Sequence, residues 1–244
     1  MSVPLVAVAH GSRDPRSPSV VRELVDSVAA RLPGVEVRTS FLDLSEPSVT
    51  DVLARLHAEG HREAIVVPLL LGSAYHARVD LPGLVDEVAA SHPLLRVSVS
   101  DVLGIDPVLE RVALHRLAET GAEVTDPRLG VVLAAVGSSN AGANAAVARI
   151  AARWQDRFGI PVAPAFASAT QPDVPAALAR LRAHGATRFA VASWFLAPGL
   201  LPDRVAALAG PEVALAAPLG PEPRVAEAVI RRYDEVLHAL RVAS

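Results

Sequence analysis

Two histidines in the first third of the chain each follow an apolar segment, which makes them candidates for metal or proton chemistry. His10 ends the apolar part of VAVAHGSRD, and His76 lies in GSAYHARVD. Two carboxylates, Asp43 and Glu46, follow another apolar segment. Imidazole and carboxylate suit Fe²⁺, Co²⁺, Ni²⁺ and Zn²⁺, and imidazole also accepts protons near neutral pH. These residue types predict a site that handles a divalent metal, protons or both.

The elements that must position these residues alternate along the chain. Apolar runs typical of strands occur at 5–9, 35–41, 64–71 and 95–100, and helical spacing of apolar residues occurs at 17–32, 46–60, 81–91 and 106–120. This order predicts a parallel sheet with helices on both faces. Ligands of such sheets bind beyond the carboxyl ends of the strands, so we expect the four candidate residues at one edge.

Each candidate also has a structural interpretation. A single histidine after a strand is usually a loop residue that hydrogen-bonds to backbone, and Asp43 or Glu46 would be favourable as a cap of the following helix. The HGSR loop at 10–13 could hold a phosphate on free N–H groups, although it matches neither common phosphate-binding pattern. The pairing of two histidines favours a functional site. The other histidines are expected at the surface: His57, His61, His92, His115, His184 and His238.

The second part of the chain repeats the first. Residues 41–60 align without a gap to residues 166–185, with many identical positions. Such long-range similarity indicates a duplicated domain. We expect an α/β half at 1–124 and a similar α/β half at 125–244. The second half lacks the candidate ligands, because the residues at their positions are Val136 for His10, Ser168 for Asp43, Gln171 for Glu46 and Leu201 for His76.

Composition excludes several classes of protein. With 244 residues, of which 51% are hydrophobic, the chain has ample material for two cores. It has no cysteine, which excludes disulfides, thiolate metal sites and iron–sulfur clusters held by this chain. A net charge of −3 gives no basic field and argues against nucleic acid. The longest apolar run is too short to span a membrane, and no leader pattern is present, so we expect a cytoplasmic protein.

Three motifs occur in order: VAVAHGSRDPRS, FLDLSEPS and VVPLLLGSAYHARVDLP. Within a duplicated α/β chain, they resemble the sirohydrochlorin chelatases of the cobalamin and siroheme pathways, in the long CbiX/SirB form with two halves. The resemblance covers nearly the whole chain. It implies insertion of Co²⁺ or Fe²⁺ into sirohydrochlorin, with no ATP and no cofactor beyond the substrate metal.

The resemblance also implies roles for particular residues. It pairs His10 and His76 as metal-binding and catalytic imidazoles, and it places a carboxylate after the second strand, where both Asp43 and Glu46 are candidates. Sirohydrochlorin carries many carboxylates, which arginines can clamp. The expected substrate-binding residues are Gly11, Ser12, Arg13, Ser73, Tyr75, Arg78 and, from the second half, Arg204. Apolar walls for the macrocycle are expected from Leu69–Leu71, Leu196, Leu200 and Leu201.

Small members of the family build their cleft from two identical subunits, so this duplicated chain is expected to act as a monomeric pseudo-dimer. Its expected partners are the tetrapyrrole and the metal ion. Imidazole and carboxylate ligands do not separate Fe²⁺ from Co²⁺ or Ni²⁺. The alternative functions are a non-catalytic tetrapyrrole or metal carrier that uses the same cleft, and a phosphoryl-transfer or anion-binding module built on the HGSR loop.

Overall fold

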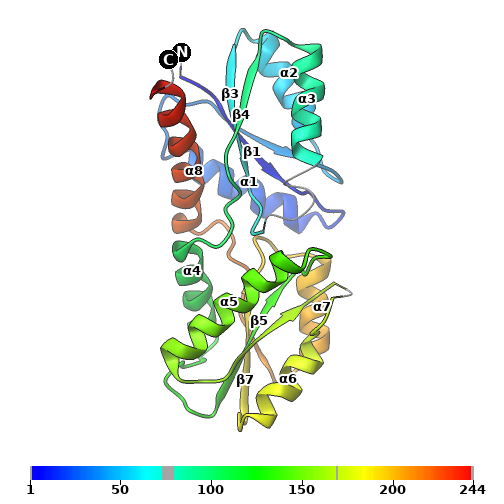
Figure 1. Ribbon diagram of the computed structural model, residues 1–244, viewed down its shortest axis with the longest axis vertical. Coiled ribbons are helices and arrows are strands. Elements are labelled where there is room, and N and C mark those ends of the chain that lie inside the picture. Colours follow the sequence, from blue (N-terminus) through cyan, green and yellow to red (C-terminus); the bar gives the residue numbers. More distant parts are fainter. Residues whose placement is uncertain (1, 73–79, 169, 243–244) are drawn as a thin grey trace. The chain divides into compact units, whose positions relative to one another are not determined.

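A computed structural model describes residues 2–72, 80–168 and 170–242, which fold into two compact α/β units. Unit 1 comprises Met1–Asp106 and Pro221–Ser244, and unit 2 comprises Pro107–Gly220. Each unit contains a four-stranded sheet whose paired strands are all parallel (Figure 1). In both sheets the strands lie in the same order, with the second strand of the unit at one edge, followed by the first, the third and the fourth. The predicted fold of two similar α/β halves is confirmed.

The elements have the following bounds. Those before the middle of the chain are β1 (Leu5–Ala9), α1 (Arg16–Ala29), β2 (Val37–Phe41), α2 (Val49–Ala58), β3 (Glu63–Pro68), α3 (Leu81–Ser91), β4 (Arg96–Val99) and α4 (Pro107–Ala118). The remaining elements are β5 (Leu129–Ala135), α5 (Ala141–Phe158), β6 (Val162–Phe166), α6 (Val174–Ala183), β7 (Arg188–Trp194), α7 (Leu200–Ala209), β8 (Ala214–Leu215) and α8 (Pro223–Val242).

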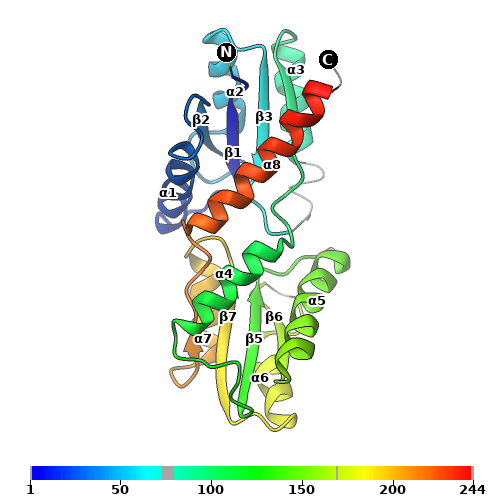
Figure 2. The ribbon, with the colours of Figure 1, turned by 90° about the vertical axis from the view of Figure 1, so that its left-hand side faces the viewer.

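The core of unit 1 lies on both faces of its sheet. Strand β1 is buried along its whole length, as a central parallel strand covered on both faces must be. Val6 and Val8 point to the face covered by α2 and α3, where they join a cluster with Leu53 and Leu81. Helices α1 and α8 pack on β2 and β3 and against each other (Figure 2). These layers hold the end of β1 in a fixed position.

Helix α2 begins later than the sequence pattern suggested. Pro47 was expected in its first turn, but the helix starts at Val49 and Ser48 is its N-cap. The Ser48 hydroxyl accepts a hydrogen bond from the backbone N–H of Asp51 at 3.1 Å. A short hydroxyl side chain satisfies an N–H that the first helical turn leaves unpaired. Because Ser48 has this role, neither Asp43 nor Glu46 caps the helix.

Two helices are exchanged between the repeats: each belongs by sequence to one repeat but packs in the compact unit formed mainly by the other. Helix α4, which follows the first repeat's last strand, packs on β7 of unit 2, whereas α8 of the second repeat packs on β3 of unit 1 (Figure 2). Strands β3 and β7 hold the same place in their sheets, so each helix covers the strand that the other would cover without the exchange. The compact units therefore differ from the expected halves 1–124 and 125–244.

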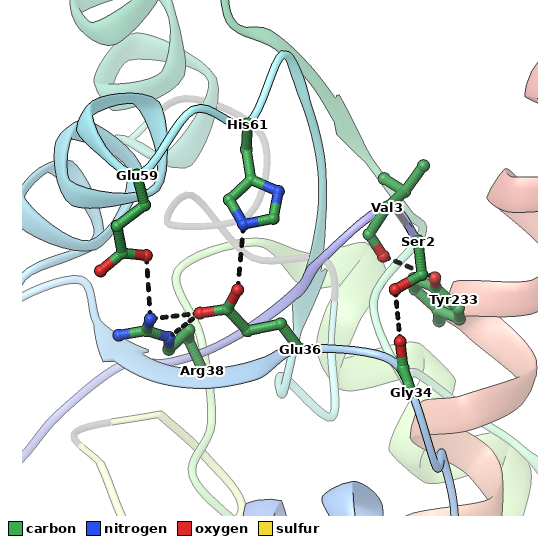
Figure 3. A network of polar contacts seen from close by, with 8 residues as sticks. All are labelled: Ser2, Val3, Gly34, Glu36, Arg38, Glu59, His61 and Tyr233. Atoms are coloured by element: carbon green, nitrogen blue, oxygen red, sulfur yellow. Dashed lines mark hydrogen bonds and ion pairs between the residues drawn. The ribbon is translucent and has the colours of Figure 1, made fainter.

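Polar contacts fix each exchanged helix within its unit. In α8 the buried Tyr233 donates its hydroxyl to the carbonyl oxygen of Val3 at 2.7 Å (Figure 3). In α4 the Glu110 carboxylate accepts from the indole N–H of Trp154 on α5 at 3.1 Å and pairs with Arg153. No helix among the described residues is long and apolar enough to cross a membrane.

Candidate active site

His10 lies directly after β1, beside the segment that follows β2. The backbone N–H of Leu42 donates to the carbonyl oxygen of Ala9 at 2.9 Å, and that of Asp43 donates to the carbonyl oxygen of His10 at 3.0 Å. The ladder between β1 and β2 thus extends beyond both strands. It brings the predicted histidine and the predicted carboxylate to neighbouring positions at the carboxyl edge of the sheet.

Gly11 allows this close approach of the two segments. Its φ is +94°, a left-handed conformation that L side chains rarely adopt. A Cβ at this position would lie 1.7 Å from the carbonyl oxygen of Asp43. Both facts require glycine here, so the residue is needed for the shape of the loop that carries His10.

Ser12 and Ser45 hold the next part of the loop together. The Ser12 N–H donates to the Ser45 hydroxyl at 3.0 Å, and that hydroxyl donates to the Ser12 carbonyl oxygen at 3.0 Å. The Ser12 hydroxyl accepts from the Asp14 N–H at 3.0 Å. Hydrogen bonds from Arg16 to Asp14, first from its side chain and then from its backbone, hold the pKa of Asp14 below its usual value. The backbone N–H groups of Ser12 and Asp14 are thus already bonded within the protein. This disfavours the use of the loop as a phosphate cradle, which needs free N–H groups.

A pocket of about 460 Å³ opens beside His10. The described residues that line it come from the end of β1, the segment after β2, and α3; they are His10, Leu42, Asp43, Asp80, Gly83, Leu84 and Glu87. The pocket joins an imidazole to three carboxylates, a donor set suited to divalent first-row metals. His10 and Asp43 are thus brought together as the sequence predicted.

Glu46 lies outside this lining. It is exposed, and its backbone carbonyl accepts from the Arg22 guanidinium at 2.9 Å. The same guanidinium lies 5.5 Å from the centre of the Phe41 ring. Of the two carboxylates left open by the sequence, Asp43 is the one that lines the pocket.

The other expected binding residues fall in three groups. Arg13 is exposed in the loop after β1, and Arg204 is exposed on α7, within unit 2. Leu69 is buried in the core at 3% exposure, so the expectation that it forms an open wall is wrong. Four expected residues lie outside the described part of the chain: Ser73, Tyr75, His76 and Arg78.

Asp80 and Glu87 are pocket residues that the sequence analysis did not identify. They occur seven residues apart, at the start of α3 and near its end, with Gly83 and Leu84 between them. This i, i+3, i+4, i+7 spacing places all four on one helical face. The spacing was readable in the sequence, but carboxylates on a helix face are usually solvated.

The corresponding edge of unit 2 has the same main-chain geometry but lacks the imidazole and the carboxylate. The Ser168 N–H donates to the Val136 carbonyl oxygen at 2.9 Å, and Gly137 has a φ of +85°. A Cβ on Gly137 would lie 2.5 Å from the Ser168 hydroxyl. Val136, at the position of His10, is 46% exposed. An exposed valine contributes little to a core, so its replacement of histidine is not explained by packing.

A second group with metal-ligand atoms lies at the opposite edge of the unit 1 sheet. Ligand atoms of Glu36, Glu59 and His61 lie within 4.8 Å of one another. The Arg38 guanidinium pairs with both carboxylates, and the His61 Nε2 lies 3.0 Å from Glu36 (Figure 3). The Arg38 guanidinium already pairs with both carboxylates, so we interpret this cluster as an ion-pair network.

An imidazole and carboxylates at the carboxyl edge of a parallel sheet, in a chain with two α/β repeats, define a metal-handling α/β protein. Two segments, residues 4–120 and 130–236, match the CbiX family, so the chain belongs to that family. The resemblance found in the motifs is thereby confirmed.

Individual relatives agree with this membership. The chain is 28% identical to the sirohydrochlorin ferrochelatase of Bacillus subtilis strain 168 over 96% of its own length and 92% of that protein. It is 25% identical to the sirohydrochlorin cobaltochelatase of Priestia megaterium, over 81% of this chain and 65% of that protein. The solved structure of SirB from Bacillus subtilis with Fe³⁺ has a TM-score of 0.78 at 26% identity, over 96% of this chain and 95% of that one.

Proposed function

We propose that this chain is a sirohydrochlorin chelatase, a lyase-class enzyme that inserts Co²⁺ or Fe²⁺ into sirohydrochlorin without ATP. The observation that carries the proposal is the pocket shared by His10 and Asp43, in a chain that belongs to the CbiX family. Relatives named for cobalt and for iron both match the chain, and their names support this pair of metals as candidates.

The chemistry of metal insertion fits the residues of the pocket. Insertion removes two protons from pyrrole nitrogens and transfers the metal from water to the macrocycle. The His10 imidazole can bind the incoming ion through a ring nitrogen or can act as a general base that accepts a pyrrole proton. The Asp43 carboxylate can share the metal or take up a proton. We propose His76 as the second imidazole, as the family resemblance implies.

The substrate is bound, in this proposal, through its carboxylates. Arg13, Arg78 and Arg204 are the proposed clamps, because guanidinium groups bind carboxylates in bidentate geometry. Ser73 and Tyr75 are proposed as further contacts. Gly11, through its positive φ, and Ser12, through its hydrogen bonds, contribute by shaping the loop. Both repeats belong to one polypeptide, and we propose a monomeric, cytoplasmic enzyme.

A metal-insertion assay tests the proposal. Purified chain is mixed with sirohydrochlorin and, in parallel, with Co²⁺, Fe²⁺ under anaerobic conditions, or Ni²⁺, without nucleotide, and insertion is followed by visible absorbance. We expect insertion of Co²⁺ or Fe²⁺ well above the rate without protein. His10→Ala should remove this enhancement, whereas His115→Ala, at an exposed position of unit 2, should leave it unchanged.

The alternatives give different outcomes in the same experiment. A carrier binds sirohydrochlorin or metal but does not accelerate insertion. An anion-binding module is stabilised by phosphate and does not bind the tetrapyrrole. Either result contradicts the proposed function, whereas equal activity of wild type and His10→Ala contradicts the assignment of His10 to the site.

A further inference from the structure

The hydroxyl group of Ser45 joins the two loops that carry the candidate catalytic residues. It accepts a hydrogen bond from the backbone N–H of Ser12 and donates one to the carbonyl oxygen of the same residue, both at 3.0 Å. Ser12 follows His10 by two positions, and Ser45 follows Asp43 by two positions. This two-bond contact ties the loop after β1 to the loop after β2, across 33 positions of the chain.

The backbone between Asp43 and Ser45 is strained. Among the described residues, Leu44 is the one residue other than glycine with a positive φ, at +60°. This left-handed conformation is unfavourable for any residue that has a Cβ. Leu44 is also 44% exposed, so burial of the leucine does not offset the strain. Strained conformations persist where the surrounding contacts impose them. Here the two-bond contact of Ser45 follows directly after the strained residue.

The strained turn in its turn holds the Asp43 carboxylate. The backbone N–H of Leu44 donates to Asp43 Oδ1 at 2.7 Å. The turn is fixed on one side by the bond from the Asp43 N–H to the His10 carbonyl oxygen, and on the other side by Ser45. If Ser45 lost its bonds, Leu44 could relax to a favourable φ. The peptide group that carries its N–H would then rotate, and the carboxylate would lose its donor.

Unit 2 shows that the loop geometry does not require the two-bond contact. Thr170 occupies the position of Ser45, and its hydroxyl donates to the carbonyl oxygen of Ser138, the counterpart of Ser12, at the longer distance of 3.3 Å. The N–H of Ser138 is bonded instead to the side chain of Asn144 on α5, at 2.9 Å. This loop is therefore held mainly by its own helix. The two-bond contact between loops is found in the unit that keeps the imidazole and the carboxylate.

We infer that Ser45 is a positioning residue for metal insertion, whose hydroxyl fixes the Asp43 carboxylate beside His10 before the substrates bind. This inference rests on the proposed function. Ser45 acts through Leu44 and Asp43, and in this role it neither takes up a proton nor contacts the metal or the tetrapyrrole. Groups that are aligned in advance need no reorganisation at the moment of reaction. Loss of the hydroxyl should therefore affect the rate of insertion rather than the binding of substrate.

Steady-state kinetics of Co²⁺ insertion test the inference. Ser45→Ala should lower kcat by about tenfold or more and leave KM for sirohydrochlorin unchanged, because residues that orient a metal ligand typically contribute 10–100-fold. Ser45→Thr restores a hydroxyl and should recover most of the rate. Thr170→Ala removes the hydroxyl at the matching position of unit 2 and should keep the wild-type rate. A loss confined to KM, no recovery in Ser45→Thr, or equal losses in the two alanine variants overturns the inference.

A double-mutant cycle shows whether Ser45 acts through Asp43. In the Asp43→Asn background, Ser45→Ala should cause little further loss of kcat, because the carboxylate that it positions is already absent. Losses that multiply would show that the two residues act independently and would overturn the inference. If Ser45→Ala does not fold, Ser45→Cys takes its place, since cysteine is close to serine in size but a weak donor. The same expectations and the same contrary results apply to it.

Failure of the proposed function is distinguishable from failure of this inference. If the wild-type chain inserts no metal, the chelatase proposal fails. Exchange of the Leu44 amide hydrogen with solvent, measured by NMR, then tests the positioning by itself. We expect exchange to be roughly fivefold faster in Ser45→Ala than in wild type or Thr170→Ala, a factor that corresponds to the net contribution of one hydrogen bond. Equal exchange rates in the three proteins overturn the inference.

Discussion

The backbone N–H of Asp43 donates to the carbonyl oxygen of His10 at 3.0 Å, and Ser168 makes the same contact with Val136 at 2.9 Å. The two loops are thus joined through main-chain atoms in both units. Side chains at these positions can change without loss of the contact, because they take no part in it. This explains how unit 2 keeps the loop geometry after it has lost the imidazole and the carboxylate.

The first prediction separates the two carboxylates after β2. Asp43→Asn should lower the rate of Co²⁺ insertion by about 10²-fold, because a positioned acid–base group typically contributes 10² or more. Glu46→Gln should stay near the wild-type rate, since Glu46 does not line the pocket. Initial rates followed by absorbance measure both. A larger loss for Glu46→Gln than for Asp43→Asn would reverse the assignment.

Gly11 provides a test of the loop geometry. Gly11→Ala combines a left-handed φ with a clash against the Asp43 carbonyl, and should lower the free energy of unfolding by about 3 kcal/mol or more. Gly60 has a similar φ of +99° but open space at its Cβ. Gly60→Ala should therefore cost only about 1–2 kcal/mol. Urea unfolding of the two variants measures the difference, and equal losses would show that the clash is relieved.

The Glu36 network predicts a dependence of stability on acid. Burial alone would raise the pKa of the Glu36 carboxyl. Hydrogen bonds and charge from Arg38 and His61 lower the pKa by more than burial raises it, so the net pKa lies below its usual value. A depressed pKa stabilises the fold above the unfolded pKa of about 4.3, and this stabilisation is lost as pH falls through the folded value.

The corresponding experiment compares unfolding at pH 7 and at stepwise lower pH. Glu36→Gln should cost about 1 kcal/mol or less at pH 7, since the group is partly exposed, and should lose less stability than wild type below about pH 4. Glu63→Gln is the control, because its pair with Arg96 is longer, at 3.5 Å, and more exposed. An identical acid response of wild type and Glu36→Gln would rule out this network as its source.

His57 and His92 give a prediction that concerns stability alone. The sequence placed them at the surface, but both are partly buried and their rings meet edge to face at a centroid distance of 5.0 Å. Each Nδ1 is buried without a hydrogen-bond partner among the described residues. An unpaired buried polar atom costs about 1–3 kcal/mol. Replacing both histidines by phenylalanine should raise the unfolding midpoint, and a fall would show that the nitrogens are satisfied.

The sequence predicted the local structure and the edge of the site well, because both depend on short-range patterns. Helix α3 has the predicted bounds, 81–91, and His10 and Asp43 meet beyond their strands as expected. The start of α2 was misplaced because Pro47 is also favourable just outside a helix, and the Ser48 cap decides the boundary.

The exchange of α4 and α8 could not be predicted in this way. The apolar residues of each helix show that one face will be buried, but the two sheets present equivalent strands to it. Asp80 and Glu87 were missed for a related reason. A carboxylate on a helix indicates a pocket only when another element, here the loop with His10, lies opposite.

The exchanged helices also set the order in which the units can be completed during synthesis. Unit 2 is one continuous segment, whereas unit 1 needs α8, which the ribosome makes after all of unit 2. Domains generally fold as units while the chain grows. The unit that carries His10 is started first and finished last, and until then β3 lacks the helix that covers it. A nascent chain of this protein therefore depends on its later residues to protect an apolar strand made long before.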